Sequence, residues 1–278
     1  MLVFTMSLPV VTFLLTYAIS LSMGLMQYPF YFLSVSIEAK PASCFGSFGL
    51  SLTCLVAPVL AFVRSKNVEK LALDVPDKVK SDRALLLNER ALKCAILAGL
   101  GGHGVASFQS KSEVPECGDA KWIVGVHLLW AGLFFGCGCL YCFISHRIDR
   151  LVPDLGTPGE RKARAMFAYG TVAQFFLLMF VLPGLYMAVG AGTNDDGTVD
   201  CSSGGCWVIV VMSGFEITLL VTFMSTYVTF LEEFRGMQLV LNVLHTDRAW
   251  SLHERDHSVM QQTAGVEIPG SAADVNYT

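Results

Sequence analysis

Three titratable side chains stand inside long apolar stretches, and they are the residues most able to do chemistry. Glu216 lies in "SGFEITLLVTFMSTYVTFLEEF", residues 213–234, His103 lies in "GLGGHG", and His127 lies in the apolar stretch that follows. An ionised carboxylate near the centre of a bilayer costs at least about 2.5–3.5 kcal/mol, so it must pair or become protonated. An acid beside an imidazole in a low dielectric can exchange a proton near neutral pH.

Six apolar stretches must position these side chains. They cover residues 5–26, 44–63, 91–109, 122–145, 165–189 and 206–231. Each is long enough to cross about 30 Å of hydrocarbon as a helix at about 1.5 Å per residue. Helices satisfy their own backbone hydrogen bonds in lipid, so the sequence predicts an all-α fold, a six-helix transmembrane domain over residues 1–231. Residues 232–278 are expected to form a tail that begins as a helix and ends disordered.

Composition favours a polytopic membrane protein over a soluble one. Of 278 residues, 53% are hydrophobic and 15% are charged, whereas soluble domains carry about 25% charged residues. The net charge of −4 does not indicate a nucleic-acid partner. The sequence contains no P-loop, dinucleotide fingerprint or HExxH motif. We therefore expect no cofactor and no metal, and we expect membrane lipids as partners.

Lys and Arg predict the orientation. All but three of the 19 basic residues fall in the connections 64–93 and 146–164 or in the tail, and the exceptions are Lys40, Lys111 and Lys121. Basic residues collect on the cytoplasmic side of a membrane, so both termini are predicted to be cytoplasmic. The first stretch has no basic residue ahead of it, which favours a retained helix over a cleaved signal peptide.

The depths of the three titratable residues favour one site. Glu216 lies just outward of the centre of its span, and His103, in an antiparallel span, lies at a similar depth, with His127 nearer the outer surface. We expect a buried polar cluster of Glu216, His103 and His127, either a clamp that fixes helix packing or a proton-sensing or ligand-contacting site. Ser107 lies one turn from His103, but we assign no catalytic residue and do not expect an enzyme. The glycines around His103 predict close helix packing.

Cysteines divide according to the predicted topology. Five lie within spans, where a thiol usually fills space: Cys54, Cys94, Cys137, Cys139 and Cys142. Four lie on or beside the predicted outer face and are disulfide candidates: Cys44, Cys117, Cys201 and Cys206. A local bridge across "CSSGGC" would leave Cys44 with Cys117, and a pairing from loop to loop is equally allowed.

Three segments together resemble a known membrane family. "PASCF" and "RSKNV" within residues 28–71, "GHGVASFQ" at 102–109 and "GFEITLLVTFMSTYVTFLEEF" at 214–234 are similar to the damage-regulated autophagy modulator (DRAM) family and its TMEM150-type and Frag-type relatives. The resemblance implies six helices with cytoplasmic ends, and a place in a lysosome-like endomembrane or the plasma membrane. It also implies links to autophagy or lipid remodelling, without an agreed set of catalytic residues.

The function that these observations favour is a non-enzymatic membrane regulator or scaffold that acts through helix and lipid contacts. Its expected partners are lipids and other proteins, or further copies of the chain. Two alternatives stay open: a lipid-binding or lipid-remodelling protein, and a subunit of an oligomeric channel or of a larger membrane complex. A single copy offers too few polar side chains for a pore of its own.

Overall fold

The computed structural model describes residues 2–24, 33–37, 40–108, 121–189 and 206–234, which belong to one compact unit. Every regular element in these ranges is helical, as the sequence predicts. The elements are α1 (Leu2–Ser22), α2 (Leu33–Ser36), α3 (Ala42–Leu73), α4 (Lys78–Ser107), α5 (Lys121–Asp149), α6 (Pro158–Phe176), the π-helix η2 (Leu177–Val181), α7 (Leu182–Val189), α8 (Cys206–Val228) and α9 (Leu231–Phe234).

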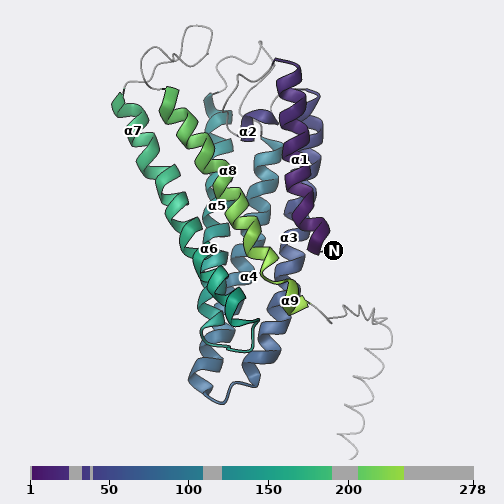
Figure 1. Cartoon of the computed structure of the whole chain (residues 1–278), viewed down its shortest axis with the longest axis vertical. Coiled ribbons are helices and arrows are strands. Elements are labelled where there is room, and N and C mark those ends of the chain that lie inside the picture. The colour runs from purple at the N-terminus through teal and green to yellow at the C-terminus, as the bar shows by residue number, and fades with distance from the viewer. Residues whose placement is uncertain (1, 25–32, 38–39, 109–120, 190–205, 235–278) are drawn as a thin grey trace, which may run out of the picture. The chain divides into compact units, whose positions relative to one another are not determined.

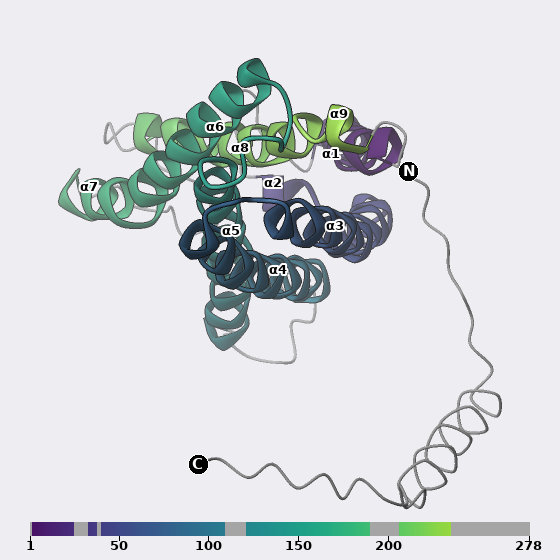
Figure 2. The same cartoon turned by 90° about the horizontal axis from the view of Figure 1, so that it is seen from below.

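The long helices lie side by side in a bundle (Figure 1). α4 packs along both α3 and α5, α6 packs along α5 and α8, and α1 packs along α3. Seen from one end, α8 lies between α6 and α1, and the row of α3, α4 and α5 lies on one side of them (Figure 2). α1 and α8 therefore meet at the periphery of the bundle.

Four helical stretches among the described residues are long and apolar enough to cross a membrane: Ala42–Leu73, Gly125–Asp149, Pro158–Leu185 and Trp207–Val228. α1 adds the shorter apolar stretch Ser7–Ser22. α4 is not among the four because its first half is rich in charged residues and its second half is rich in glycine. The chain is thus an integral membrane protein of helices, and the count of six spans stays a prediction.

Two of the expected basic connections are largely helical, so the helices extend beyond the predicted spans. α3 continues to Leu73 and α4 begins at Lys78, so most of residues 64–93 is helix. Asp77 caps α4, and its carboxylate accepts from the backbone N–H groups of Val79 at 3.1 Å and Lys80 at 3.2 Å. The hydrogen bond from the Lys80 backbone, with the Lys80 ammonium nearby, lowers the pKa of Asp77 below its ordinary value. A helix requires hydrogen-bonded backbone groups but does not require lipid. α3 and α4 can therefore extend beyond the apolar part of their sequences.

The second connection is shortened in the same way. α5 runs to Asp149, and α6 begins at Pro158 behind a capping box in which Thr157 and Glu160 bond each other's backbone N–H groups. At the other end of α6, η2 separates α6 from α7. The Leu182 N–H donates to the Leu177 carbonyl there. Pro183 is the next residue and has no N–H to donate, so the regular α-helical hydrogen bonding is interrupted here, next to the wider π-helical turn.

Glycines bring α4 close to its neighbours, as the sequence predicts. A methyl group added at Gly101 would overlap the backbone of Phe134 on α5, and one at Gly104 would overlap the Trp130 ring. At Gly102 the overlap would be with the Cys54 thiol of α3. Absent side chains let helices approach closely enough for backbone and ring atoms to make contact. α4 is therefore fixed in the middle of the row.

Candidate functional site

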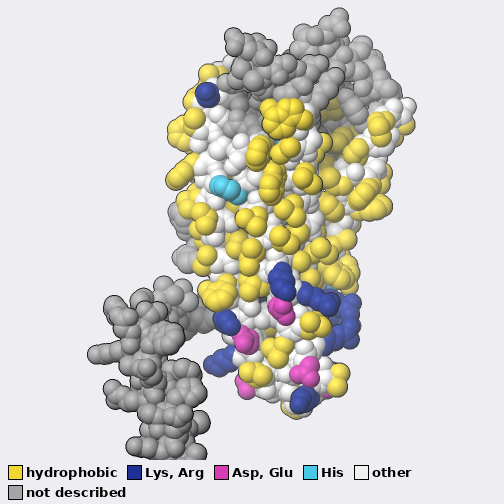
Figure 3. Space-filling view, turned by 180° about the vertical axis from the view of Figure 1, so that it is seen from behind, with side chains coloured by type: hydrophobic (Ala, Val, Ile, Leu, Met, Phe, Trp, Pro, Cys, Tyr) yellow, Lys and Arg dark blue, Asp and Glu magenta, His cyan; other side chains and the backbone are white. Residues whose placement is uncertain are grey.

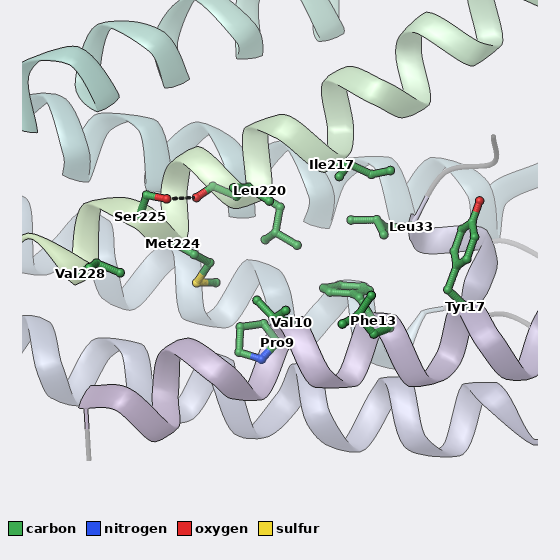
Figure 4. Close-up of a pocket in the computed structure, with 12 residues that line it drawn as sticks. Pro9, Val10, Phe13, Tyr17, Leu33, Ile217, Leu220, Met224, Ser225 and Val228 are labelled. Carbon is green, nitrogen blue, oxygen red and sulfur yellow. Dashed lines mark hydrogen bonds between the residues drawn. The ribbon is translucent and has the colours of Figure 1, made fainter. Parts of the chain in front are cut away.

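An apolar groove of about 380 Å³ runs between α1 and α8, and we call it the α1–α8 groove (Figure 4). Its lining residues are Pro9, Val10, Phe13, Leu14 and Tyr17 from α1, Leu33 from α2, and Ile217, Leu220, Val221, Met224, Ser225 and Val228 from α8. Along α8 the lining extends about 16 Å, from Ile217 to Val228, at the rise of an α-helix. Leu33 lies near Tyr17 and Ile217 at one end (Figure 4).

The wall of the groove consists almost entirely of hydrocarbon. The Ser225 hydroxyl donates to the Val221 backbone carbonyl at 2.7 Å, so it is already satisfied within the helix. Val10, Leu14 and Val221 are exposed, which opens the groove sideways to the surroundings of the bundle. Its volume falls within the roughly 300–1,000 Å³ of small-molecule sites. A site with these properties has the size and polarity that an apolar chain needs.

Glu216 holds the segment that borders one end of the groove. Its Oε2 atom accepts a hydrogen bond from the backbone N–H of Leu33 at 2.7 Å. Leu33 begins α2, where the first N–H groups of a helix have no partner within the helix. The carboxylate therefore ties α2 to α8, and the Leu33 side chain reaches the groove lining.

The two histidines have other partners. His103 is exposed, and its Nδ1 atom lies 3.1 Å from the Ser51 hydroxyl on α3. His127 is buried, and its Nδ1 atom lies 2.6 Å from the Phe108 carbonyl. The expected Glu216–His103 pair is not among these contacts, and none of them joins two of the three residues, so the cluster remains a prediction. The Ser107 hydroxyl donates to the His103 backbone carbonyl at 2.9 Å.

A cluster of four charged side chains lies at the end of the bundle that carries the α3–α4 connection. We call Arg64, Asp149, Arg164 and Glu233 the buried ion cluster, and each comes from a different helix. The Asp149 Oδ1 atom accepts from Arg64 Nη2 at 2.9 Å and from Arg164 Nη1 at 2.8 Å. Glu233 accepts from Arg64 Nε at 3.1 Å and also pairs with Arg164. None of the four side chains is more than 3% exposed.

Neighbouring groups complete the cluster. Arg164 donates to the Thr229 carbonyl at 3.2 Å. Its guanidinium and that of Arg64 lie 5.2 and 4.3 Å from the centre of the Phe230 ring, within the range of cation–π attraction. Gly156, with φ of +74°, leaves the space that the Arg164 guanidinium occupies. Two cations and two anions cancel, so the cluster joins α3, α5, α6 and α9 without leaving net charge in the interior.

This cluster is not evident from the sequence, in which Arg64 and Arg164 fit a basic cytoplasmic surface. One signal was present. Arg64, Asp149, Arg164 and Glu233 each lie within a few residues of a predicted span end, all on the predicted cytoplasmic side. Equal numbers of opposite charges at the same depth are typical of an internal ion pair.

The candidate disulfide residues are described only in part. Cys44 is exposed and forms no disulfide with another described residue. Cys117 and Cys201 lie outside the described residues, and the Cys206 side chain does too, although its backbone begins α8. Either pairing of these cysteines therefore remains a prediction. Cys54, Cys139 and Cys142 are buried within their helices, as expected of space-filling thiols.

Long apolar helices, an apolar outer surface and charges gathered at one end define a helical-bundle integral membrane protein. The model of one family, Frag1/DRAM/Sfk1/Cwh43P N-terminal domain, matches residues 1–237. The chain belongs to this family, in agreement with the segments that resemble it. No curated protein and no solved structure matches the chain.

Proposed function

We propose that this protein is a non-enzymatic membrane regulator that holds the acyl chain of a membrane lipid in the α1–α8 groove. The hydrocarbon wall of the groove and its sideways opening are the observations that support this proposal. Lipid tails are as apolar as leucine, so retention of a tail would come from close packing against the lining. The bound lipid would regulate the protein by changing the packing of α1 against α8.

The proposal includes a six-span topology with both termini in the cytoplasm, in an endomembrane or the plasma membrane. Its support is that the α3–α4 connection, the α5–α6 connection and α9 lie at the same end of the bundle (Figure 1). The stretches around the two connections, residues 64–93 and 146–164, hold 13 of the 19 basic residues. The positive-inside rule then assigns that end to the cytoplasm.

Native mass spectrometry of the protein purified in mild detergent tests the groove. Val10→Trp and Val221→Trp each place a large ring in the mouth of the groove at an exposed position, where the fold should tolerate it. Val59→Trp on α3 is the matched control, because Val59 is exposed on the bundle surface and does not line the groove. We expect at least one more bound lipid in the wild type and the control than in the two groove variants. Equal numbers of lipid adducts in all four proteins would contradict the proposal.

A further inference from the structure

A second cavity, of about 460 Å³, lies where α5 ends and α6 begins, and we call it the corner cavity. It is lined by His146 and Asp149 of α5, by Arg150 directly after α5, and by Pro158, Arg161, Lys162 and Ala165 of α6. Arg150 also borders an adjacent hollow of about 230 Å³ that Arg83 and Arg147 line. Five basic side chains therefore surround one corner of the bundle.

Three of these basic side chains have no acidic partner among the described residues. Arg150, Arg161 and Lys162 form no ion pair with the residues that the structure describes. Elsewhere on the same end of the bundle, three exposed lysines pair with acidic neighbours on their own helix or at its cap. The pairs are Lys66 with Glu69, Lys80 with Asp77 and Lys93 with Glu89. The corner cavity thus presents unneutralised positive charge.

Asp149 is the one acidic residue in the lining, and the arginines of the buried ion cluster balance its charge. Its Oδ1 atom accepts from both Arg64 and Arg164, and the buried ion cluster as a whole is neutral. Its Oδ2 atom is buried and has no hydrogen-bond partner in the described part of the chain. An anion in the cavity would therefore meet a net positive field from Arg150, Arg161 and Lys162.

His146 contributes a buried polar atom to the lining of the corner cavity. The side chain is only 8% exposed, lines the cavity, and packs its ring against Tyr169 with centroids 5.6 Å apart. Its Nδ1 atom is buried without a hydrogen-bond partner among the described residues. Buried polar atoms are rarely left unpaired, because losing water without a new partner costs about 1–3 kcal/mol. A protonated Nδ1 would donate to an anionic oxygen placed in the cavity.

The surface beside the cavity indicates a lipid as the source of that oxygen. Lys162, Met166 and Tyr169 lie at i, i+4 and i+7 on one face of α6. Met166 and Tyr169 are exposed, so apolar surface begins one turn beyond the charge. Figure 3 shows the same order on one face of the molecule, with Lys and Arg side chains at the lower edge of the hydrophobic surface. A headgroup would meet the basic residues while its tails lie along α6.

We infer that the corner cavity binds the phosphate of an anionic phospholipid, with Arg150, Arg161 and Lys162 as its cationic contacts and His146 as a hydrogen-bond donor. On the proposed topology this corner faces the cytoplasmic leaflet, where anionic lipids are concentrated. The site is separate from the α1–α8 groove and shares no lining residue with it.

The probe is a fluorescent short-chain phosphatidic acid, titrated into the whole purified chain in neutral detergent and followed by fluorescence anisotropy. We expect the double variant Arg161→Gln with Lys162→Gln to weaken binding roughly 10- to 30-fold, since a basic residue near an anionic headgroup contributes about 1 kcal/mol. The control, Lys66→Gln with Lys93→Gln, removes the same charge from paired, exposed sites, and should change affinity less than about threefold. His146→Phe keeps a ring against Tyr169 and should also weaken binding.

Each arm has an outcome that overturns the inference. Equal losses in the corner and control variants would mean that only overall charge matters. Equal binding of short-chain phosphatidylcholine would remove the requirement for an anion. Competition by glycerol phosphate at concentrations equal to the lipid would assign the cavity to a soluble phosphate instead. The Val10→Trp variant should bind the probe normally, so that failure of this site and failure of the groove proposal can be told apart.

Discussion

Arg64 and Arg164 come from α3 and α6, yet both donate to the Oδ1 atom of Asp149, at 2.9 and 2.8 Å. Two guanidinium groups this close repel unless anions lie between them, and Asp149 and Glu233 supply those anions. The arrangement is complete only when all four helices are in place. The buried ion cluster should therefore contribute to the specificity of the fold as well as to its stability.

Removing one cation from the cluster should be strongly destabilising. Arg164→Met leaves Asp149 and Glu233 with only Arg64, and we expect a loss of about 3–5 kcal/mol in the free energy of unfolding. Adding Glu233→Gln leaves Arg64 paired with Asp149, so the double variant should be more stable than Arg164→Met alone. Thermal or denaturant unfolding in detergent measures both differences. A double variant less stable than the single would show that charge balance is not what the cluster provides.

An exposed ion pair gives the comparison for that experiment. Lys66 pairs with Glu69 at 2.7 Å, but both side chains are about half exposed. Lys66→Met should change the free energy of unfolding by no more than about 1 kcal/mol, because water screens such pairs. A cost equal to that of Arg164→Met would contradict the assigned difference between buried and exposed charge.

Adding a methyl group at the α4–α5 contact should also destabilise the bundle. The side chain of Gly101→Ala would overlap backbone atoms of α5, which cannot rotate away, and we expect a cost of about 1–3 kcal/mol. Gly132→Ala meets open space on α5 and should be neutral or stabilising by up to about 1 kcal/mol, because alanine is the better helix former. Melting temperatures of the two variants in one detergent make the comparison. Equal temperatures would show that α4 and α5 are less closely packed.

The hydrogen bond from Leu33 to Glu216 gives a prediction about α2. Glu216→Gln keeps an oxygen acceptor for the Leu33 N–H, whereas Glu216→Leu removes it. Hydrogen exchange at the Leu33 amide should be nearly unchanged in the first variant and faster in the second, by about 5- to 10-fold for a hydrogen bond worth about 1 kcal/mol or slightly more. Faster exchange in both variants would mean that the negative charge, and not the acceptor, holds α2.

The proposed topology predicts which segments reagents can reach. A single introduced cysteine at Val75, in the α3–α4 connection, should react with a membrane-impermeant thiol reagent only after the cytoplasmic side is opened. The sequon at Asn276 should stay unglycosylated, because glycans are added on the opposite side. Labelling of intact cells or organelles at the Val75 position would reverse the orientation.

Hydropathy was sufficient to predict the helices but not where they end. The apolar run around Pro58 stops at Phe62 and Val63, so residues 64–73 read as a connection although α3 continues through them. In those residues the backbone is satisfied within the helix, and polar side chains can face water or the ion cluster. The length of an apolar run indicates which residues lie in lipid. The position of a helix end depends instead on local caps such as Asp77.

The candidate sites were harder to predict because they join residues far apart in the sequence. The sequence correctly predicts that Glu216 has a partner, because a carboxylate in an apolar helix must be paired. One of its partners is a backbone N–H, which has no signature in the sequence, and the expected imidazole partner stays a prediction. The α1–α8 groove depends on how two apolar helices diverge, and residues such as Phe13 and Met224 look the same in a core and in a groove.

The α1–α8 groove is the central claim, and a high-resolution structure of the whole chain in a phospholipid nanodisc tests it most directly. We predict an elongated density between α1 and α8, in contact with Phe13, Leu220 and Met224 and ending near Leu33. Closure of the groove by direct contact of α1 with α8, or its occupation by a segment of this chain, would contradict the account.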